Sequence, residues 1–190
     1  MVAAEHASMT LLHTRMPTLS SEPIAWGTYA SSPTTHFFLC RYISVSPLLP
    51  PPPVLIPHLE ELHENSSPDG DFGSPHTAYG GRNPQLFLRS KSWEESFSQG
   101  LDAMFDTEET AQGADLEMRK LRERLMTKVI PRLLRPLQTE GRVLVPALVH
   151  GDLWDGNVGT EEETGRTVIF DAVALYAHNE CKSLPDLRGV

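Results

Sequence analysis

The stretch 149-VHGDLWDGN-157 carries the densest group of chemically reactive side chains in the 190-residue chain. It contains His150 and Asp152, and Asn157 follows the carboxylate by five residues. Three interpretations are open for such a corner: a turn without chemistry, part of a metal-dependent hydrolase, or the catalytic loop of a phosphoryl-transfer enzyme. The segments on either side favour one of them.

Apolar runs flank this stretch, 142-RVLVPALVH-150 before it and 166-RTVIFD-171 after it. Residues 158–166 predict a β-hairpin with a solvated acidic tip. The returning strand brings Asp171 back beside Asn157, and Asp152 lies one loop away. The sequence therefore predicts that an amide and two carboxylates gather at one corner of the molecule.

Phosphoryl transfer from a nucleotide depends mainly on positioning and on charge neutralisation. One carboxylate deprotonates the attacking hydroxyl, while a carboxylate and an amide hold Mg²⁺ on the phosphates. Magnesium keeps several waters and takes few protein oxygens, so one Asp and one Asn are enough. A His-x-Asp loop, an Asn five residues after the Asp and a later Asp at a strand end match the kinase pattern. The phosphoryl-transfer interpretation is therefore favoured over a chance turn.

The composition narrows the class of protein. A net charge of −9 argues against general binding to nucleic acid or to an anionic membrane surface, because such binding rests on clustered Lys and Arg. No window is apolar enough for a membrane span, and the first residues lack the pattern of a signal peptide. With only Cys40 and Cys181, a disulfide framework is not expected. We expect an acidic, cytoplasmic protein.

Several elements can be predicted from periodicity and turn residues. The N-terminal part predicts a helix over 3–15 and strands over 23–30 and 35–45. The stretch 46-SPLLPPPPVLIP-57 predicts an extended polyproline segment between two lobes. A short helix is expected directly after Pro57, followed by an irregular segment over 68–84.

Two further helices are predicted in the second half. Ser92 to Glu95 has the spacing of a capping box, which indicates a helix through about Met104. A stripe of apolar residues predicts a long core-facing helix over 114–137, bent near Pro131. Its members are Met118, Leu121, Leu125, Val129, Leu133 and Leu137. Both Trp26 and Trp93 are expected in the core.

Four segments carry a resemblance to a known family: LVHGDLWDGNVG, VIFDAVALYAHNE, LEELHENSSPDGDFG and SWEESF. Together they resemble the fructosamine kinase and ketosamine-3-kinase family, in particular its fungal protein-ribulosamine 3-kinase members, from about Ala4 to Glu180. The resemblance implies an α+β, protein-kinase-like fold of the aminoglycoside-phosphotransferase type. It further implies a partial N-lobe at 1–46, a Pro-rich connector at 47–57 and a partial, mainly helical C-lobe at 58–190.

The family uses ATP to phosphorylate the sugar 3-hydroxyl of ketosamines on protein amines, which releases the sugar and repairs glycated protein. The resemblance thus implies ATP and Mg²⁺ as cofactors and glycated proteins or small ketosamines as substrates. In this chain Asp152 would be the base for the hydroxyl, His150 would brace the loop, and Trp154 would line the sugar pocket.

The remaining roles follow from the same resemblance. Asn157 and Asp171 would bind Mg²⁺. The backbone of Leu39, Cys40 and Tyr42 would meet adenine at the hinge. Glu5 would match the helix Glu that pairs with a phosphate-binding Lys.

The chain departs from the family in its first part. The first lysine is Lys91, and Gly27 is the one glycine before the Pro run, so neither a phosphate-clamping Lys nor a Gly-rich cover is present there. We therefore expect a member that is truncated at both ends, has weak or no ATP-dependent activity, and exposes apolar faces. Two alternatives stay open. One is a non-catalytic, pseudokinase-like binding module. The other is a metal-dependent phosphohydrolase, with His150, Asp152, Asp171 and His178 as ligands.

Overall fold

Two short apolar strands lie at the centre of the molecule. In the computed structural model, which describes residues 1–46 and 48–181, β6 (Ala147–Val149) pairs antiparallel with β9 (Leu175–Ala177). Successive side chains of a strand point to opposite faces. Leu148 and Tyr176 therefore enter one hydrophobic cluster, while Val149 and its neighbours enter a second one. Both faces of this strand pair are buried, which explains why the strands carry no polar alternation.

The first cluster is closed by two helices. Helix α1 (Val2–Arg15) contributes Met9 and Leu12, and α2 (Pro52–Glu64) contributes Leu62. The helix predicted over 3–15 is thereby confirmed. Its acidic residue Glu5 is only partly buried, because the apolar face of α1 is turned toward the strands.

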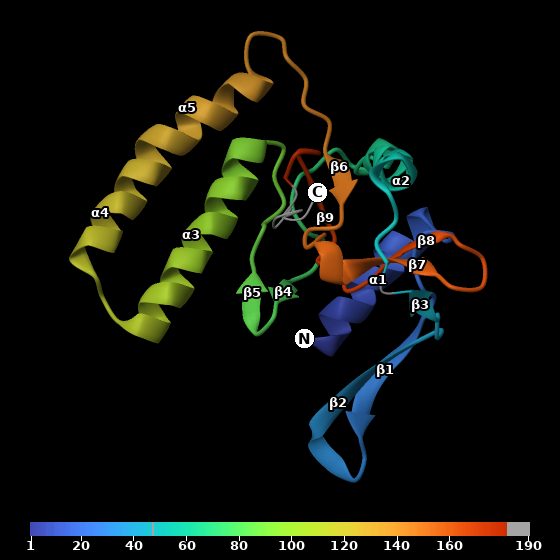
Figure 1. Cartoon of the computed structure of the whole chain (residues 1–190). Coiled ribbons are helices and arrows are strands. Elements are labelled where there is room, and N and C mark those ends of the chain that lie inside the picture. Colours follow the sequence, from blue (N-terminus) through green and yellow to red (C-terminus); the bar gives the residue numbers. More distant parts are fainter. Residues whose placement is uncertain (47, 182–190) are drawn as a thin grey trace.

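Strands β1 (Pro23–Tyr29) and β2 (Ser32–Cys40) form an antiparallel hairpin that projects from the body of the molecule (Figure 1). Both predicted strands are present, although β2 ends at Cys40 and not at Val45, and the expected burial of Trp26 is wrong. Its side chain is 50% exposed, because a two-stranded ribbon without a covering layer leaves its faces to solvent. Trp93, by contrast, is 2% exposed and belongs to the second cluster.

The Pro-rich stretch is helical from its middle onward, so the prediction of an extended segment up to Pro57 is wrong. Helix α2 begins at Pro52, where a residue without an N–H costs nothing because the first helical turn has no partner for it. Pro57 lies inside the helix and removes one hydrogen bond, and burial of Leu59 and Leu62 opposes that loss. Residue 47, where the predicted connector begins, and residues 182–190 of the predicted C-lobe lie outside the described residues.

A long helical hairpin covers the second cluster. Helix α3 (Trp93–Gln112) starts at Ser92, whose hydroxyl accepts the Glu95 N–H at 3.3 Å. The predicted N-cap is confirmed, but the reciprocal bond of a capping box is not formed, because the Ser92 N–H donates to Ser90 Oγ at 3.0 Å. The helix also runs eight residues past Met104, up to Gln112. The other arm consists of α4 (Leu116–Arg124), a π-helical stretch (Leu125–Val129), α5 (Ile130–Leu134) and a 3₁₀ turn (Arg135–Gln138). The change in hydrogen bonding at the π-helical stretch lies just before the bend predicted at Pro131.

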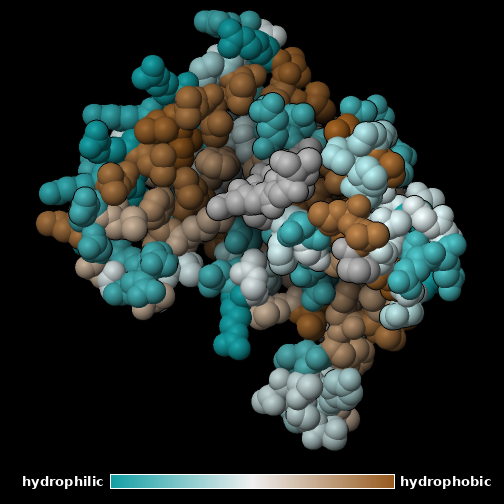
Figure 2. Space-filling model, in the orientation of Figure 1, coloured by the Kyte–Doolittle hydropathy of each residue, from teal (hydrophilic) through white to brown (hydrophobic). Residues whose placement is uncertain are grey.

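The predicted core-facing stripe on this arm is largely wrong. Leu121 and Leu133 are 52% and 62% exposed, whereas Leu137 of the predicted stripe packs against the second cluster together with Leu134, which lies outside the stripe. Figure 2 shows the resulting apolar surface over the helical hairpin. The stripe is exposed because the second arm contacts α3 mainly through its α5 end. None of the described helices is both long and apolar enough to cross a membrane.

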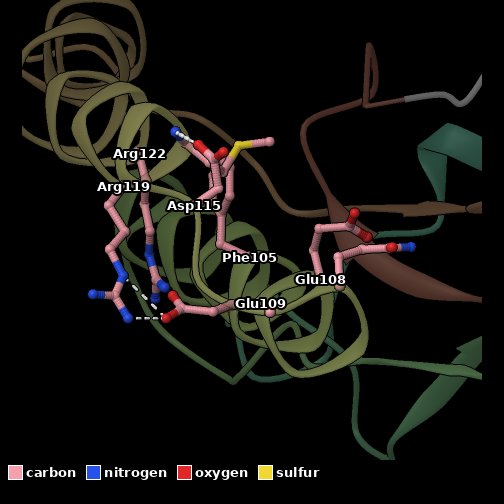
Figure 3. Close-up of a pocket in the computed structure, with 9 residues that line it drawn as sticks. Phe105, Glu108, Glu109, Asp115, Arg119 and Arg122 are labelled. Atoms are coloured by element: carbon pink, nitrogen blue, oxygen red, sulfur yellow. Dashed lines mark hydrogen bonds and ion pairs between the residues drawn. The ribbon is translucent and has the colours of Figure 1, made fainter.

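Ion pairs close the far end of the helical hairpin around a small cavity of about 60 Å³ (Figure 3). Arg119 pairs with Glu109, and Arg122 pairs with Asp102 and Asp106 at 2.7 Å while its guanidinium lies 5.6 Å from the Phe105 ring centroid. Such a cavity is too small for a nucleotide or a sugar. We interpret it as a structural contact between α3 and α4.

Candidate functional site

The His-Gly-Asp corner follows directly from β6. Gly151 has a φ of +80°, and a Cβ at this position would lie 2.2 Å from the Val173 carbonyl oxygen. The Val173 N–H in turn donates to the His150 carbonyl oxygen at 2.9 Å. Only glycine fits both the backbone conformation and this close approach. The glycine between the His and the Asp is therefore a requirement of the turn itself.

His150 ties this loop to the end of the opposite hairpin. Its ring is 3% exposed, Nε2 donates to the Phe170 carbonyl oxygen at 3.0 Å, and Nδ1 accepts the Asp152 N–H at 3.3 Å. Burial lowers the pKa of His150 to about 4, so the ring is neutral and keeps both bonds at physiological pH. His150 thus fixes the backbone of Asp152 relative to Phe170, the residue before Asp171.

This burial makes stability depend on pH. Between pH 6.5 and about 4, His150 is protonated in the unfolded chain but stays neutral in the folded chain. The free energy of unfolding therefore falls as the pH falls through this window. The expected loss is about 3 kcal/mol. Urea unfolding followed at several pH values measures it.

The matched variant for this measurement is His150→Gln, which keeps one donor and one acceptor but does not titrate. The raised pKa values of Glu5 and Asp152 change stability with the opposite sign, and they are common to both proteins. The difference between the two pH profiles therefore isolates His150. Parallel profiles between pH 6.5 and 4 would contradict a buried, neutral ring.

The predicted hairpin is present as β7 (Val158–Glu161) and β8 (Thr167–Ile169). The Phe170 N–H donates to the Asn157 carbonyl oxygen at 3.1 Å, which places Asp171 beside Asn157 in the backbone. Asn157 is 4% exposed, and its Nδ2 donates to the Asp152 carbonyl oxygen at 2.8 Å and to Asp152 Oδ2 at 3.3 Å. These bonds hold the Asn157 side chain against Asp152, but Asn157 itself lines neither of the two cavities that Asp152 lines.

Three carboxylates line one cavity of about 200 Å³ between α1 and the two loops: Glu5, Asp152 and Asp171. Burial, together with the charge of Asp171, raises the pKa of Glu5. The pKa of Asp152 is raised by burial and then by Asp171, while the hydrogen bond from Asn157 opposes the shift. The structure thus brings Asp152 and Asp171 to one site, and adds Glu5 to it. We name this space the acidic cavity.

A second cavity of about 370 Å³ also reaches Asp152. Its walls include Phe87, Met104 and Leu175, together with the turn of the hairpin formed by β4 (Ala78–Gly80) and β5 (Asn83–Gln85). Gly81 in that turn lines both cavities. These residues were not predicted as site residues, and the Gly80-Gly81 pair within the segment expected to be irregular signalled the turn itself. We name this space the apolar cavity.

Other predicted site residues lie elsewhere. Leu39 and Cys40 sit at the end of β2 and are exposed, and Tyr42 is 86% exposed. None of the three lines either cavity. Trp154 is 44% exposed and lies against Gly156 of its own loop, where a Cβ would come within 2.4 Å of the indole ring. It lines neither cavity.

The donor set suits a hard cation that keeps its waters. Within residues 1–46 and 48–181, no group of three or more His, Cys, Asp or Glu side chains is arranged as a closed metal site. Glu5, Asp152 and Asp171 nevertheless face one cavity, where burial and then the charge of Asp171 raise the pKa values of Glu5 and Asp152. Magnesium typically takes one or two carboxylates, several waters and the phosphates of its substrate. The open, acidic site therefore fits Mg²⁺ better than a tightly enclosed transition metal.

The chain is similar to known proteins of one family. The sequence profile described as fructosamine kinase matches residues 1–184. The chain belongs to the fructosamine kinase family. Its named relatives are kinases, so this is a family of phosphotransferases, which use ATP.

The relatives of this fructosamine kinase family member are longer than the chain. A ketosamine-3-kinase of Mus musculus is 39% identical over 98 residues, which are 51% of this chain and 29% of the mouse protein. A chloroplastic protein-ribulosamine 3-kinase of Oryza sativa subsp. indica is 29% identical over 127 residues, 65% of this chain and 34% of the rice protein. The chain thus matches about a third of the length of these relatives.

Solved structures show the fold. A protein of Thermobifida fusca YX-ER1 assigned as a fructosamine-3-kinase has a TM-score of 0.67 at 20% identity, over 94% of this chain and 56% of that one. The corresponding protein of Haemophilus somnus 129PT gives 0.66 at 17% identity, over 95% and 57%. The α+β, protein-kinase-like fold is thereby established.

Proposed function

We propose that this chain carries the catalytic centre of an ATP-dependent kinase for the sugar 3-hydroxyl of ketosamines, ribulosamine or fructosamine, linked to protein amines. The observation that carries the proposal is the acidic cavity, in which Asp152 and Asp171 face the same space. Phosphorylation at this position would serve the repair of glycated proteins in the cytoplasm.

Asp152 is proposed as the base. It lies on a loop fixed by His150 and Asn157, so the carboxylate is held in place before a substrate arrives. A base works best when its pKa lies nearer the working pH, and burial shifts the pKa of Asp152 in that direction. In the proposed step the Asp152 carboxylate accepts the proton of the sugar hydroxyl as the oxygen attacks the terminal phosphate.

Asp171 and Asn157 are proposed as the residues that hold Mg²⁺ on the nucleotide. The metal would neutralise charge on the phosphates. Asp171 lines the acidic cavity, and the bond from the Phe170 N–H to the Asn157 carbonyl oxygen holds the two residues side by side. The sequence also suggests Leu39, Cys40 and Tyr42 as the adenine contacts and Trp154 as a sugar contact, and these assignments remain proposals.

Turnover by this chain is proposed to be slow. In active kinases, the helix glutamate to which Glu5 would correspond pairs with a Lys. Residues 1–46 of this chain contain no Lys. Glu5 instead shares the acidic cavity with Asp152 and Asp171. A non-catalytic binding module is the second candidate function, favoured by this missing partner. Release of ADP in the presence of a ribulosamine-bearing protein distinguishes the two, because the binding module releases none.

The hydrolase alternative has less support. A two-metal hydrolase needs free imidazole nitrogens, but both ring nitrogens of His150 are engaged, one with Phe170 and the other with Asp152. The ring of His178 accepts the Glu180 N–H at 3.0 Å through Nδ1. Neither ring is arranged together with the carboxylates as a metal site among the described residues.

Binding of the magnesium nucleotide tests the proposal directly. Titration calorimetry with a non-hydrolysable ATP analogue should show binding that requires Mg²⁺, and Asp171→Asn should weaken it by at least tenfold because a charged ligand becomes neutral. Asp155→Asn is the matched control, since Asp155 is exposed on the same loop and lines neither cavity. Equal affinities of the two variants, or binding without Mg²⁺, would refute the assignment of Asp171.

A further inference from the structure

The two cavities meet at Asp152 but differ in chemistry. Gly81, Asp152 and Val173 line both of them. The acidic cavity adds Glu5 and Asp171, so a cation and the phosphates it carries belong there. The apolar cavity adds the side chains of Phe87, Met104 and Leu175, and its polar contributors are Gln85 and backbone. A ligand that reaches from one cavity into the other must therefore carry its charged groups on one side of Asp152 and its apolar groups on the other.

Among the described residues that line the apolar cavity, Asp152 is the one that carries a charge. The other titratable group of this cavity is Cys181, and burial raises the pKa of that thiol to about 11, so it is neutral at physiological pH. At about 370 Å³ the space lies within the range of pockets that bind small organic ligands. An uncharged, partly apolar group suits this space, whereas a nucleotide phosphate does not.

The side chains that line the apolar cavity differ in how tightly they are packed against the rest of the protein. Leu175 is 3% exposed in the second cluster, and the Phe87 ring packs so closely on α3 that a Cβ at Gly100 would lie 2.7 Å from it. Met104 is partly exposed on α3 and belongs to neither cluster. Its flexible thioether can adapt to ligands of different shape. Met104 is therefore the adjustable part of the wall.

We infer that the apolar cavity receives the alkyl group on the amine nitrogen of the ketosamine, and that Met104 is a specificity-determining residue for this group. The inference rests on the proposed function, because it requires the sugar hydroxyl to lie at Asp152. With the sugar there and the phosphates in the acidic cavity, the amine side of the substrate extends between Phe87, Met104 and Leu175. The site would then select ketosamines on alkyl amines over the free amino sugar.

A homologous series of ligands tests this inference. Ribulosamines with N-methyl, N-butyl and N-hexyl groups are titrated calorimetrically into the whole chain, with Mg²⁺ and a non-hydrolysable ATP analogue present. Affinity should rise about fourfold for each methylene that enters the cavity. Met104→Gln should remove much of this gain, whereas Met104→Leu, which conserves volume and polarity, should keep it. Met118→Gln makes the same chemical change on exposed α4 and should have no effect.

The outcomes separate the inference from the proposed function. If the protein binds the nucleotide but its affinity for the ribulosamines does not depend on the length of the alkyl chain, the inference is refuted and the proposed function is not. Equal gains in Met104→Gln and the unaltered protein overturn the role of Met104. A third outcome is an affinity that depends on the length of the alkyl chain in a protein that shows no Mg²⁺-dependent nucleotide binding. That result would support the assignment of the apolar cavity and refute the proposed phosphotransfer.

Discussion

Replacing Asp152 with asparagine is expected to lower the rate of sugar phosphorylation by about 10²–10⁴-fold, the usual contribution of a positioned general base. Asparagine has nearly the same shape, and its side-chain oxygen can still accept the hydrogen bond that Asn157 donates to Asp152 Oδ2 at 3.3 Å. The loop should therefore keep its conformation while losing the proton acceptor. Because turnover of the chain is expected to be slow, the rate is measured in single turnovers with the protein in excess over a ribulosamine-bearing peptide and with Mg²⁺ and ATP present.

The affinity for the magnesium nucleotide is the second measurement on this variant. Burial and then the charge of Asp171 raise the pKa of Asp152, so removing the charge at 152 relieves repulsion of Asp171 and should not weaken nucleotide binding. Asp155→Asn again serves as the control and should leave both quantities unchanged. An unaltered rate in Asp152→Asn would exclude this residue as the base. Loss of nucleotide affinity would instead make Asp152 a metal ligand.

Replacing Gly151 with alanine is expected to destabilise the fold by about 3 kcal/mol or more. The added Cβ would lie 2.2 Å from the Val173 carbonyl oxygen, a backbone atom that cannot move without disturbing the bond from Val173 N–H to His150. The positive φ of +80° adds backbone strain. The midpoint of urea unfolding, with its slope, measures the loss.

Gly165→Ala is the matched control for this substitution. Gly165 has a φ of +71°, but nothing lies within 4 Å of an added Cβ. The control thus carries the strain of the left-handed conformation without the clash, and should cost about 1 kcal/mol. Similar losses in both variants would show that the contact between Gly151 and Val173 is not tight, and that the corner tolerates a side chain.

The sequence predicted the local architecture of the site well. The order of the His-Gly-Asp loop, the hairpin over 158–166 and the second Asp at the strand end together predicted that Asp171 returns beside Asn157, which the bond from Phe170 to Asn157 bears out. These features are local. A hairpin and a turn are specified by neighbouring residues, so their geometry can be derived without knowing the rest of the fold.

Long-range packing explains the predictions that were wrong. Periodicity identified an apolar stripe on the second helical arm and correctly included Leu137, but could not tell that Leu121 and Leu133 would stay exposed while Leu134 is covered. The Pro run was predicted as extended because proline disfavours helix interiors. In the fold, Leu59 and Leu62 have an apolar surface to bury against, which favours the helix from Pro52 onward.

The sequence by itself predicted which groups would do the chemistry: an Asp on a glycine-containing corner, an Asn five residues later and an Asp at the end of a short strand. Only the tertiary structure decided that Glu5 of α1 joins Asp152 and Asp171, and that Phe87 and Met104 form a second cavity on the other side of Asp152. The reason is that spacing along a chain fixes contacts within a turn or a hairpin. Contacts between elements far apart in the sequence depend on which apolar faces are buried against each other, and a local sequence pattern does not specify this.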